Sequence, residues 1–279
     1  MVKLGVHLAL WTRDWSDDIL PYAEKARSIG FDGVEISLLG DVAAAPEATG
    51  AAIRAMGLEA TCTTGLGPAT DLASEDPAVR AAGVDALRSS IDVTARLGSP
   101  QLTGVIYGAW GVVAPGKRQD RLAWARDGLA AVAGDAEAAN VQLGIEAINR
   151  YETDLVNTAD QAVALAEAVG SSHVGVLLDS YHMNIEEVLP ADAIRRTGRW
   201  LRHFHVSDND RGAPGGGLID FAAQAKALAE IGYDGWVTTE MFILPDVNVS
   251  ADLTIWRAIE PDPDEAARAA LSHMRKTLG

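Results

Sequence analysis

Short apolar runs alternate along the chain with longer stretches in which Ala, Leu, Glu and Arg recur at helical spacing. The apolar runs predict eight strands, over residues 3–10, 33–37, 58–64, 101–107, 141–146, 173–179, 200–206 and 235–240. Helices are expected between the strands, and several helical stretches close on a glycine that can take the left-handed conformation, at Gly30, Gly57, Gly98, Gly170 and Gly232.

Eight strands in strict alternation with helices indicate an α/β protein with a (β/α)₈ TIM barrel rather than a doubly wound sheet. Internal sequence similarity supports repeated βα units, because IGFDGVEIS at 29–37 and IGYDGWVTTE at 231–240 share a helix end, a turn and a strand start. Such a barrel takes about 250 residues, so we expect one catalytic domain over 1–279. Residues 243–263 lack periodicity and predict a long loop before the last helix.

Composition narrows the classes of partner. The formal net charge of −16 argues against nucleic acid and anionic membrane surfaces, because the field of the protein would repel both. No apolar run approaches the ~18 residues of a membrane span, and MVKLGVHLAL at the N-terminus carries no cleavage site, so we expect a cytoplasmic protein. Cys62 is the only cysteine, which excludes an internal disulfide framework and a multi-thiolate zinc site.

Ionisable residues stand at the ends of four successive predicted strands. Glu146, Asp179 and Glu240 end the fifth, sixth and eighth strands, and His205 lies one residue before the end of the seventh. Catalytic groups of a barrel stand at this edge. Three carboxylates placed together would repel one another and could not all stay ionised without a cation. These four residues therefore predict a divalent metal site, and the oxygen-rich set with one nitrogen suits Mn²⁺, Mg²⁺ or Co²⁺ better than a structural zinc.

Longer motifs surround these residues: EAINRYETDLVNT at 146–158, LLDSYHMNIEE at 177–187, HFHVSDNDRGAPGGG at 203–217 and GYDGWVTTEMF at 232–242. Through them the chain resembles the ketose 3-epimerases, the family of D-tagatose 3-epimerase and D-allulose (D-psicose) 3-epimerase, whose fold is xylose isomerase-like. The resemblance runs nearly from end to end. The metal quartet is shared with hydroxypyruvate isomerases, whereas NRYET and YHMNIEE are more particular to the epimerases.

The resemblance implies metal-dependent epimerisation of free ketoses at C3, by deprotonation and reprotonation through a cis-enediolate. Glu146 and Glu240 would be the two bases as well as metal ligands, with Mn²⁺ as the expected ion. Glu152, His182 and Arg211 match positions at which the family contacts the substrate near O1 to O3. Candidate substrates are D-tagatose or D-sorbose, D-fructose or D-allulose, and ketopentoses such as L-ribulose, and a homodimer or homotetramer is expected.

Some aromatic residues, and some positions that differ from the family, are expected to contact the part of the sugar away from its reacting end. Trp15, Trp110 and Phe242 follow the first, fourth and eighth predicted strands, where they are expected to form an apolar wall over the substrate. His7 stands where the family often has a different residue facing the far end of the sugar, and Met241 where many relatives carry proline. These changes bear on recognition of C4 to C6.

Other activities stay open at this point. One is a single-metal aldose–ketose or hydroxypyruvate-type isomerase, and another is the lyase subunit that acts on 3-oxo-glycosides. A two-metal sugar isomerase is disfavoured, because none of the five lysines falls at a predicted strand end. A sugar-binding module without activity is also disfavoured, because it has no need of a base on each face of its ligand.

Overall fold

Eight parallel strands close into a barrel in chain order in the computed structural model, which describes residues 2–40, 44–114 and 116–279. The strands are β1 Lys3–His7, β2 Gly33–Ser37, β3 Glu59–Leu66, β4 Gln101–Ala109, β5 Gln142–Glu146, β6 Val174–Asp179, β7 Leu201–Val206 and β8 Trp236–Thr239. Pairing of Val6 with Thr239 joins β1 to β8 and completes the ring. The TIM barrel and all eight predicted strands are therefore confirmed.

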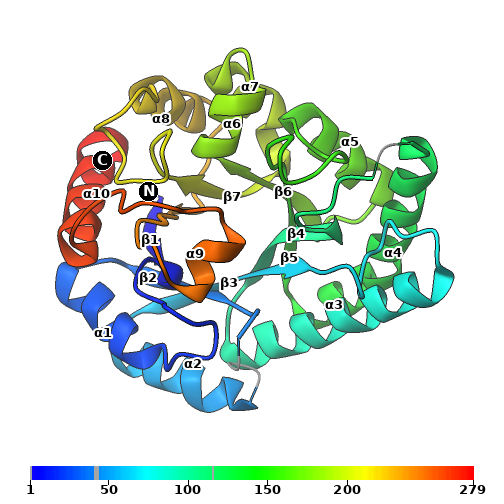
Figure 1. The fold of residues 1–279 in the computed structure, drawn as a ribbon, viewed down its shortest axis with the longest axis horizontal. Helices are drawn as coiled ribbons and strands as arrows, with labels where there is room; N and C mark the ends of the chain where they lie inside the picture. Colours follow the sequence, from blue (N-terminus) through cyan, green and yellow to red (C-terminus); the bar gives the residue numbers. More distant parts are fainter. Residues whose placement is uncertain (1, 41–43, 115) are drawn as a thin grey trace.

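Helices surround the barrel (Figure 1). They are α1 Leu20–Ile29, α2 Pro46–Ala55, α3 Pro77–Leu97, α4 Arg118–Ala139, α5 Ala159–Val169, α6 Ser180–Glu186, α7 Pro190–Thr197, α8 Phe221–Glu230, α9 Asn248–Asp252 and α10 Pro263–Leu278. The glycine stops are confirmed as well, since all five predicted positions have a positive φ. Within the described residues, no helix combines the length and the apolar character that a membrane crossing requires.

Two predicted elements differ from the structure. The strand predicted over 3–10 ends at His7, because the His7 side chain accepts a hydrogen bond from the backbone N–H of Ala9 and starts a 3₁₀ turn, η1 Leu8–Leu10. The segment 243–263, predicted as a loop, contains α9. Five residues are too few to leave a helical period in the sequence.

Alternation along each strand separates the core from the site. In β2, Val34 and Ile36 are fully buried and face the helices, whereas Glu35 between them faces the barrel interior. In β7, His203 and His205 face inward, and Phe204 packs outward. The apolar core therefore occupies the layer between strands and helices, and the interior of the barrel is free to hold polar groups.

Candidate active site

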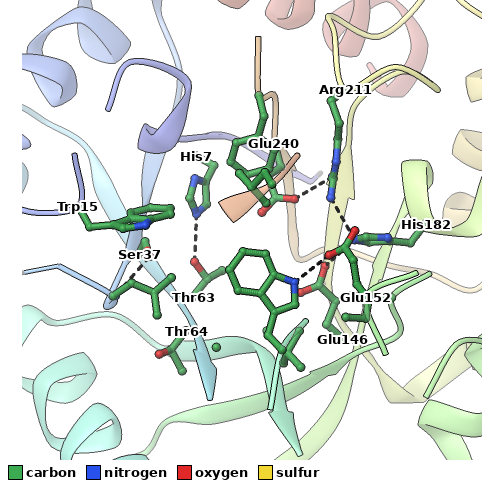
Figure 2. A pocket seen from close by; sticks show the side chains of 18 residues that line it. His7, Trp15, Ser37, Thr63, Thr64, Glu146, Glu152, His182, Arg211 and Glu240 are labelled. Carbon is green, nitrogen blue, oxygen red and sulfur yellow. Dashed lines mark hydrogen bonds and ion pairs between the residues drawn. The ribbon is translucent and has the colours of Figure 1, made fainter. Parts of the chain in front are cut away.

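A pocket with about 570 Å³ of space, part of it open to solvent, lies at the carboxyl-terminal end of the barrel, where the strands pass into their loops (Figure 2). Most of the residues predicted for the site line it, namely Trp15, Trp110, Glu146, Glu152, His182, Arg211, Glu240 and Phe242. The other two, Asp179 and His205, have no exposed surface and are close to its charged residues. The structure thus places every predicted site residue in one region.

Four side chains form a cluster that can hold a metal ion. Glu146, Asp179, His205 and Glu240 each offer one ligand atom, and these atoms lie within 4.8 Å of one another. His205 Nδ1 is buried without a hydrogen-bond partner among the described residues and lies 3.5 Å from Glu240 Oε2. Asp179 Oδ1 accepts the backbone N–H of Tyr181 at 2.6 Å, which leaves Oδ2 facing the cluster.

The charges of this cluster do not balance by themselves. Arg211 Nη1 bonds Asp179 Oδ2 at 2.7 Å and Glu240 Oε2 at 3.0 Å, so one guanidinium faces three buried carboxylates. Burial and the negative charge of Glu240 raise the pKa of Glu146 well above its ordinary range. Burial also opposes ionisation of Glu240, but His205 and Arg211 hold its pKa below the ordinary range. When carboxylates share a site that has too little positive charge, their pKa values move apart in this way. The set of donors therefore fits a divalent cation.

A second group of side chains faces the pocket beside the cluster. His182 Nδ1 accepts the backbone N–H of Asn149 at 3.2 Å, which directs Nε2 into the pocket, 3.8 Å from Glu146 Oε1 and 3.1 Å from Arg211 Nη2. Burial and the charge of Arg211 lower the pKa of His182, so the ring is neutral. The pocket thus offers an uncharged imidazole next to a guanidinium.

Glu152 is held at both carboxylate oxygens. Asn149 Nδ2 donates to Oε1 at 2.6 Å, and Trp110 Nε1 donates to Oε2 at 2.8 Å. Burial works against the ionised form, but the charge of Arg211 and the hydrogen bonds from Trp110 and Asn149 lower the pKa of Glu152 below its ordinary value. An ionised acceptor therefore lies on the pocket wall in one orientation.

The loop after β7 fixes Arg211. The glycine-rich part of this loop folds around the Asp208 carboxylate, whose Oδ2 accepts the backbone N–H groups of Gly215 at 2.9 Å and Gly217 at 2.7 Å. Arg211 itself has a φ of 70°, a left-handed conformation that is uncommon for a residue with a side chain. Its guanidinium carbon stacks 4.0 Å from the ring centroid of Tyr181. The strained backbone of Arg211 thus directs its charged side chain into the pocket.

Aromatic residues line the pocket beside the cluster, where the Phe242 ring centroid lies 5.2 Å from the guanidinium carbon of Arg211. Phe242 packs against His7 with ring centroids 6.1 Å apart, and Trp15 Nε1 donates to Asp252 Oδ2 of α9 at 3.0 Å. His7 Nε2 contacts Thr63 Oγ1 at 3.0 Å, which places a polar pair among the apolar rings (Figure 2). This end of the pocket can therefore contact both carbon and hydroxyl groups of a ligand.

Three residues that support the site from below were not predicted from the sequence. Glu35 and His203 form a second buried group with His205, and Asn149 orients His182 and Glu152. A signal for Glu35 is present, because a charged residue interrupts the apolar run GVEIS. His203 has the same strand parity as His205, so both must face one side.

Comparisons with known proteins agree with this geometry. The sequence model of the xylose isomerase-like TIM barrel family matches residues 23–277. The chain is 36% identical to ketose 3-epimerase of Arthrobacter globiformis, covering 99% of this chain and 97% of that protein. It is 34% identical to L-ribulose 3-epimerase of Methylomonas sp., covering 99% and 97%. A crystal structure of D-psicose 3-epimerase in the presence of D-fructose superposes with a TM-score of 0.95 at 32% identity, covering 100% of both chains.

Proposed function

This chain belongs to the xylose isomerase-like TIM barrel family and, within it, to the ketose 3-epimerases, and we propose that it epimerises free ketoses at C3 with the help of a divalent metal ion. The observation that carries the proposal is the pair Glu146 and Glu240, which belong to one metal-binding cluster and also line one pocket. Epimerisation needs a base on each face of the reacting carbon, and this pair meets that need.

Glu146 and Glu240 are proposed to transfer the proton. They come from β5 and from the residue after β8, so β6 and β7 separate their strands in the ring. A small sugar between them meets one carboxylate on each side. One glutamate takes the C3 proton and the other returns a proton to the opposite face, and the direction depends on which epimer is bound.

The metal is proposed to be held by Glu146, Asp179, His205 and Glu240. When bound, a divalent ion stabilises negative charge that develops on the sugar oxygens beside C3, which makes removal of the proton possible at neutral pH. Mn²⁺ is our proposed ion, because three oxygens and one imidazole nitrogen suit it. Asp179 and His205 have no exposed surface, so we assign them to holding the ion rather than to proton transfer.

Arg211, His182 and Glu152 are proposed to bind the hydroxyl and carbonyl oxygens at the reacting end of the sugar. The guanidinium is a donor and the ionised carboxylate an acceptor, so together they fix the orientation of adjacent oxygens. Trp15, Trp110 and Phe242 are proposed to cover the apolar faces of the sugar. His7 and Thr63 also line the pocket, and they are proposed to contact the C4 to C6 hydroxyls.

Substrate identity and assembly belong to the same proposal. Relatives that carry the names ketose, L-ribulose and D-psicose 3-epimerase match at similar identity, so ketohexoses and ketopentoses are both candidates. A cytoplasmic homodimer or homotetramer is the form that we propose for the enzyme. The full-length match to the 3-epimerases supports this activity over a hydroxypyruvate-type isomerase or a 3-oxo-glycoside lyase subunit.

The deciding experiment follows the C3 hydrogen. Purified protein is stripped with a chelator, reloaded with Mn²⁺ and incubated in D₂O with D-fructose, D-tagatose or L-ribulose. We expect the 3-epimer to form by chromatography and deuterium to enter C3 by NMR. Formation of an aldose with deuterium at C2 instead would identify an aldose–ketose isomerase and overturn the proposal.

Matched variants test the two bases. Glu146→Gln and Glu240→Gln each keep an oxygen ligand but can no longer accept a proton. We expect turnover to fall by about 10³-fold or more in each, with substrate binding weakened less. An exposed control, Glu59→Gln, should retain full turnover, since Glu59 pairs with Lys3 at the opposite end of the barrel. Full epimerisation by either active-site variant would remove that glutamate from the mechanism.

A further inference from the structure

A second buried cluster lies directly behind the metal ligands, inside the barrel. Glu35 of β2, His203 and His205 of β7 each place a ligand-type atom in it, and none of the three has any exposed surface. Glu35 is absent from the lining of the pocket. It therefore has no path to the substrate and can act on the reaction only through its neighbours.

Glu35 and His205 share a short hydrogen bond. His205 Nε2 lies 2.6 Å from Glu35 Oε1, while Thr61 Oγ1 donates to Oε2 at 2.9 Å. His203 Nε2 lies 2.7 Å from Oε2 without the alignment of a hydrogen bond, and its Nδ1 is 2.6 Å from Gln101 Nε2. The contacts thus run from the metal cluster through Glu35 to His203 and Gln101.

A carboxylate only accepts hydrogen bonds, so the groups that bond it must supply the hydrogens. His205 therefore meets Glu35 with an N–H at Nε2. The other ring nitrogen, Nδ1, is then the one with a free lone pair, and this is the atom that lies 3.5 Å from Glu240 and has no partner among the described residues. The hydrogen bond to Glu35 therefore favours the neutral tautomer that carries its proton on Nε2.

We infer that Glu35 is a positioning residue that keeps the proton of His205 on Nε2 and so presents Nδ1 as the nitrogen ligand of the metal. The inference rests on the metal site of the proposed function. A carboxylate behind a ligating histidine fixes the orientation of the ring and increases its strength as a donor to the metal. Glu35 fills this place from β2, across the interior of the barrel from β7.

A spectroscopic test uses the unaltered protein. The chain is labelled with ¹⁵N-histidine, and His205→Gln is recorded alongside to assign its ring. With the diamagnetic ion Mg²⁺ bound, we expect a His205 proton on Nε2, shifted downfield by its short bond to Glu35, and no proton on Nδ1. A proton on Nδ1 in the loaded protein would overturn the inference.

An affinity test uses variants of Glu35 and a matched neighbour. Glu35→Leu removes the acceptor with little change of volume, and Glu35→Gln weakens it by removing the charge. We expect the Mn²⁺ dissociation constant, measured from free Mn²⁺ by EPR, to rise about 10–100-fold in Leu and less in Gln. Thr61→Val loses a different bond to the same carboxylate and should bind Mn²⁺ like the wild type.

The outcomes separate the two proposals. If Glu35→Leu does not fold, Glu35→Gln and the NMR experiment still decide the matter. Wild-type affinity in both Glu35 variants, or an equal loss in Thr61→Val, would mean that Glu35 only fills the interior and would overturn the inference while leaving the epimerase assignment intact. Failure of the wild type to bind Mn²⁺ or Mg²⁺ would overturn the metal site and this inference together.

Discussion

Arg211 joins the metal cluster to the side chains that face the substrate. Its Nη1 bonds Asp179 and Glu240, its Nη2 lies 3.1 Å from His182, and its plane stacks on Tyr181. A planar guanidinium makes these contacts at the same time, whereas an ammonium provides one compact charge on a flexible stem. The residue type, and not only its charge, is therefore required here.

Replacement of Arg211 by lysine tests this requirement. We expect kcat/KM for the best ketose to fall about 100-fold, which corresponds to about 2.7 kcal/mol for loss of part of a buried, hydrogen-bonded charge group. Steady-state kinetics at saturating Mn²⁺ would measure the change. Arg88→Lys, at an exposed ion pair with Asp135, is the control and should be fully active. Equal activity of the two variants would contradict the role of the guanidinium.

Trp110 has a polar role as well as an apolar one, because its indole N–H donates to Glu152. Trp110→Phe keeps an aromatic face and removes the donor to Glu152 Oε2, so the Glu152 carboxylate is held less firmly in its orientation. We expect KM to rise about tenfold, the equivalent of about 1.4 kcal/mol for a hydrogen bond to a charged group, with kcat nearly unchanged. A variant with lower kcat and normal KM would show that Trp110 acts on the chemical step instead.

Single residues differ in how far the sequence reveals them. Glu146, Asp179 and Glu240 could be predicted because each follows an apolar run that ends at the reactive edge of the barrel. Roles for Glu152 could be taken only from the resemblance, because a loop acid has no periodic pattern around it. Glu35 was not predicted, since its partners lie on β3 and β7 and only the closed barrel brings them to it.

At the scale of elements, α10 connects the end of the chain to its beginning. Asp264 in its first turn accepts the indole N–H of Trp11 at 2.7 Å and the ammonium of Lys25 at 2.9 Å. Trp11 follows β1, and Lys25 belongs to α1, beside which α10 lies in Figure 1. A single carboxylate thus connects the last helix to the segment after β1 and to α1.

The contact between Asp264 and Lys25 makes the stability of the fold depend on pH. Lys25 holds the pKa of Asp264 below its ordinary value of 3.8, with Trp11 adding to the effect. A lowered pKa in the folded state stabilises the protein above the unfolded pKa, and that stability is lost as pH falls through the folded value. We expect Asp264→Asn to lower the melting temperature at pH 7 by roughly 2–4 °C, for about 1 kcal/mol at a partly exposed pair.

Differential scanning calorimetry across pH would check the prediction. The gap in melting temperature between wild type and Asp264→Asn should be constant near neutrality and should narrow below pH 4 or thereabouts, where the wild-type carboxylate also becomes neutral. Asp135→Asn, which breaks an exposed pair with Arg88, is a control for general loss of surface charge. A gap that does not change with pH would mean that the Lys25 contact contributes nothing.

Helix α9 shows why one element escaped prediction. It has five residues, Asn248–Asp252, and none of its stability can come from a helical repeat. Its contacts are with the loop after β1, where Asn248 bonds Asp14 and Asp252 accepts from the Trp15 indole. In Figure 1 it lies over the barrel mouth, and Leu253 at its end lines the pocket. Its position was therefore set by tertiary contacts, which a local pattern does not contain.

For the molecule as a whole, the barrel was predictable because alternation of strands and helices is a local property repeated along the chain. What alternation does not give is which side chains meet across the interior. Glu35 and His205 are 170 positions apart, and they meet across the interior because closure of the ring leaves only β1 and β8 between β2 and β7. Closure of the ring thus creates the inner cluster that supports the metal site.

Binding of the metal should stabilise the whole fold, because its ligands come from β5 through the end of β8. A ligand that binds only the folded state at 100 times its dissociation constant adds about 2.7 kcal/mol, which corresponds to a rise of roughly 5–10 °C in melting temperature for a chain of this size. We expect chelated protein to melt lower by this amount and to recover on addition of Mn²⁺, as measured by calorimetry.

The net charge of −16 makes a control necessary, because exposed Asp and Glu side chains attract Mn²⁺ without a defined site. Asp179→Asn weakens one ligand in the buried cluster and leaves that surface intact. If the cluster holds the ion, the Mn²⁺-dependent rise should shrink strongly in Asp179→Asn while added salt leaves the wild-type rise largely unchanged, since buried charges are screened little. A rise of equal size in both proteins would assign the stabilisation to the surface and contradict the buried site.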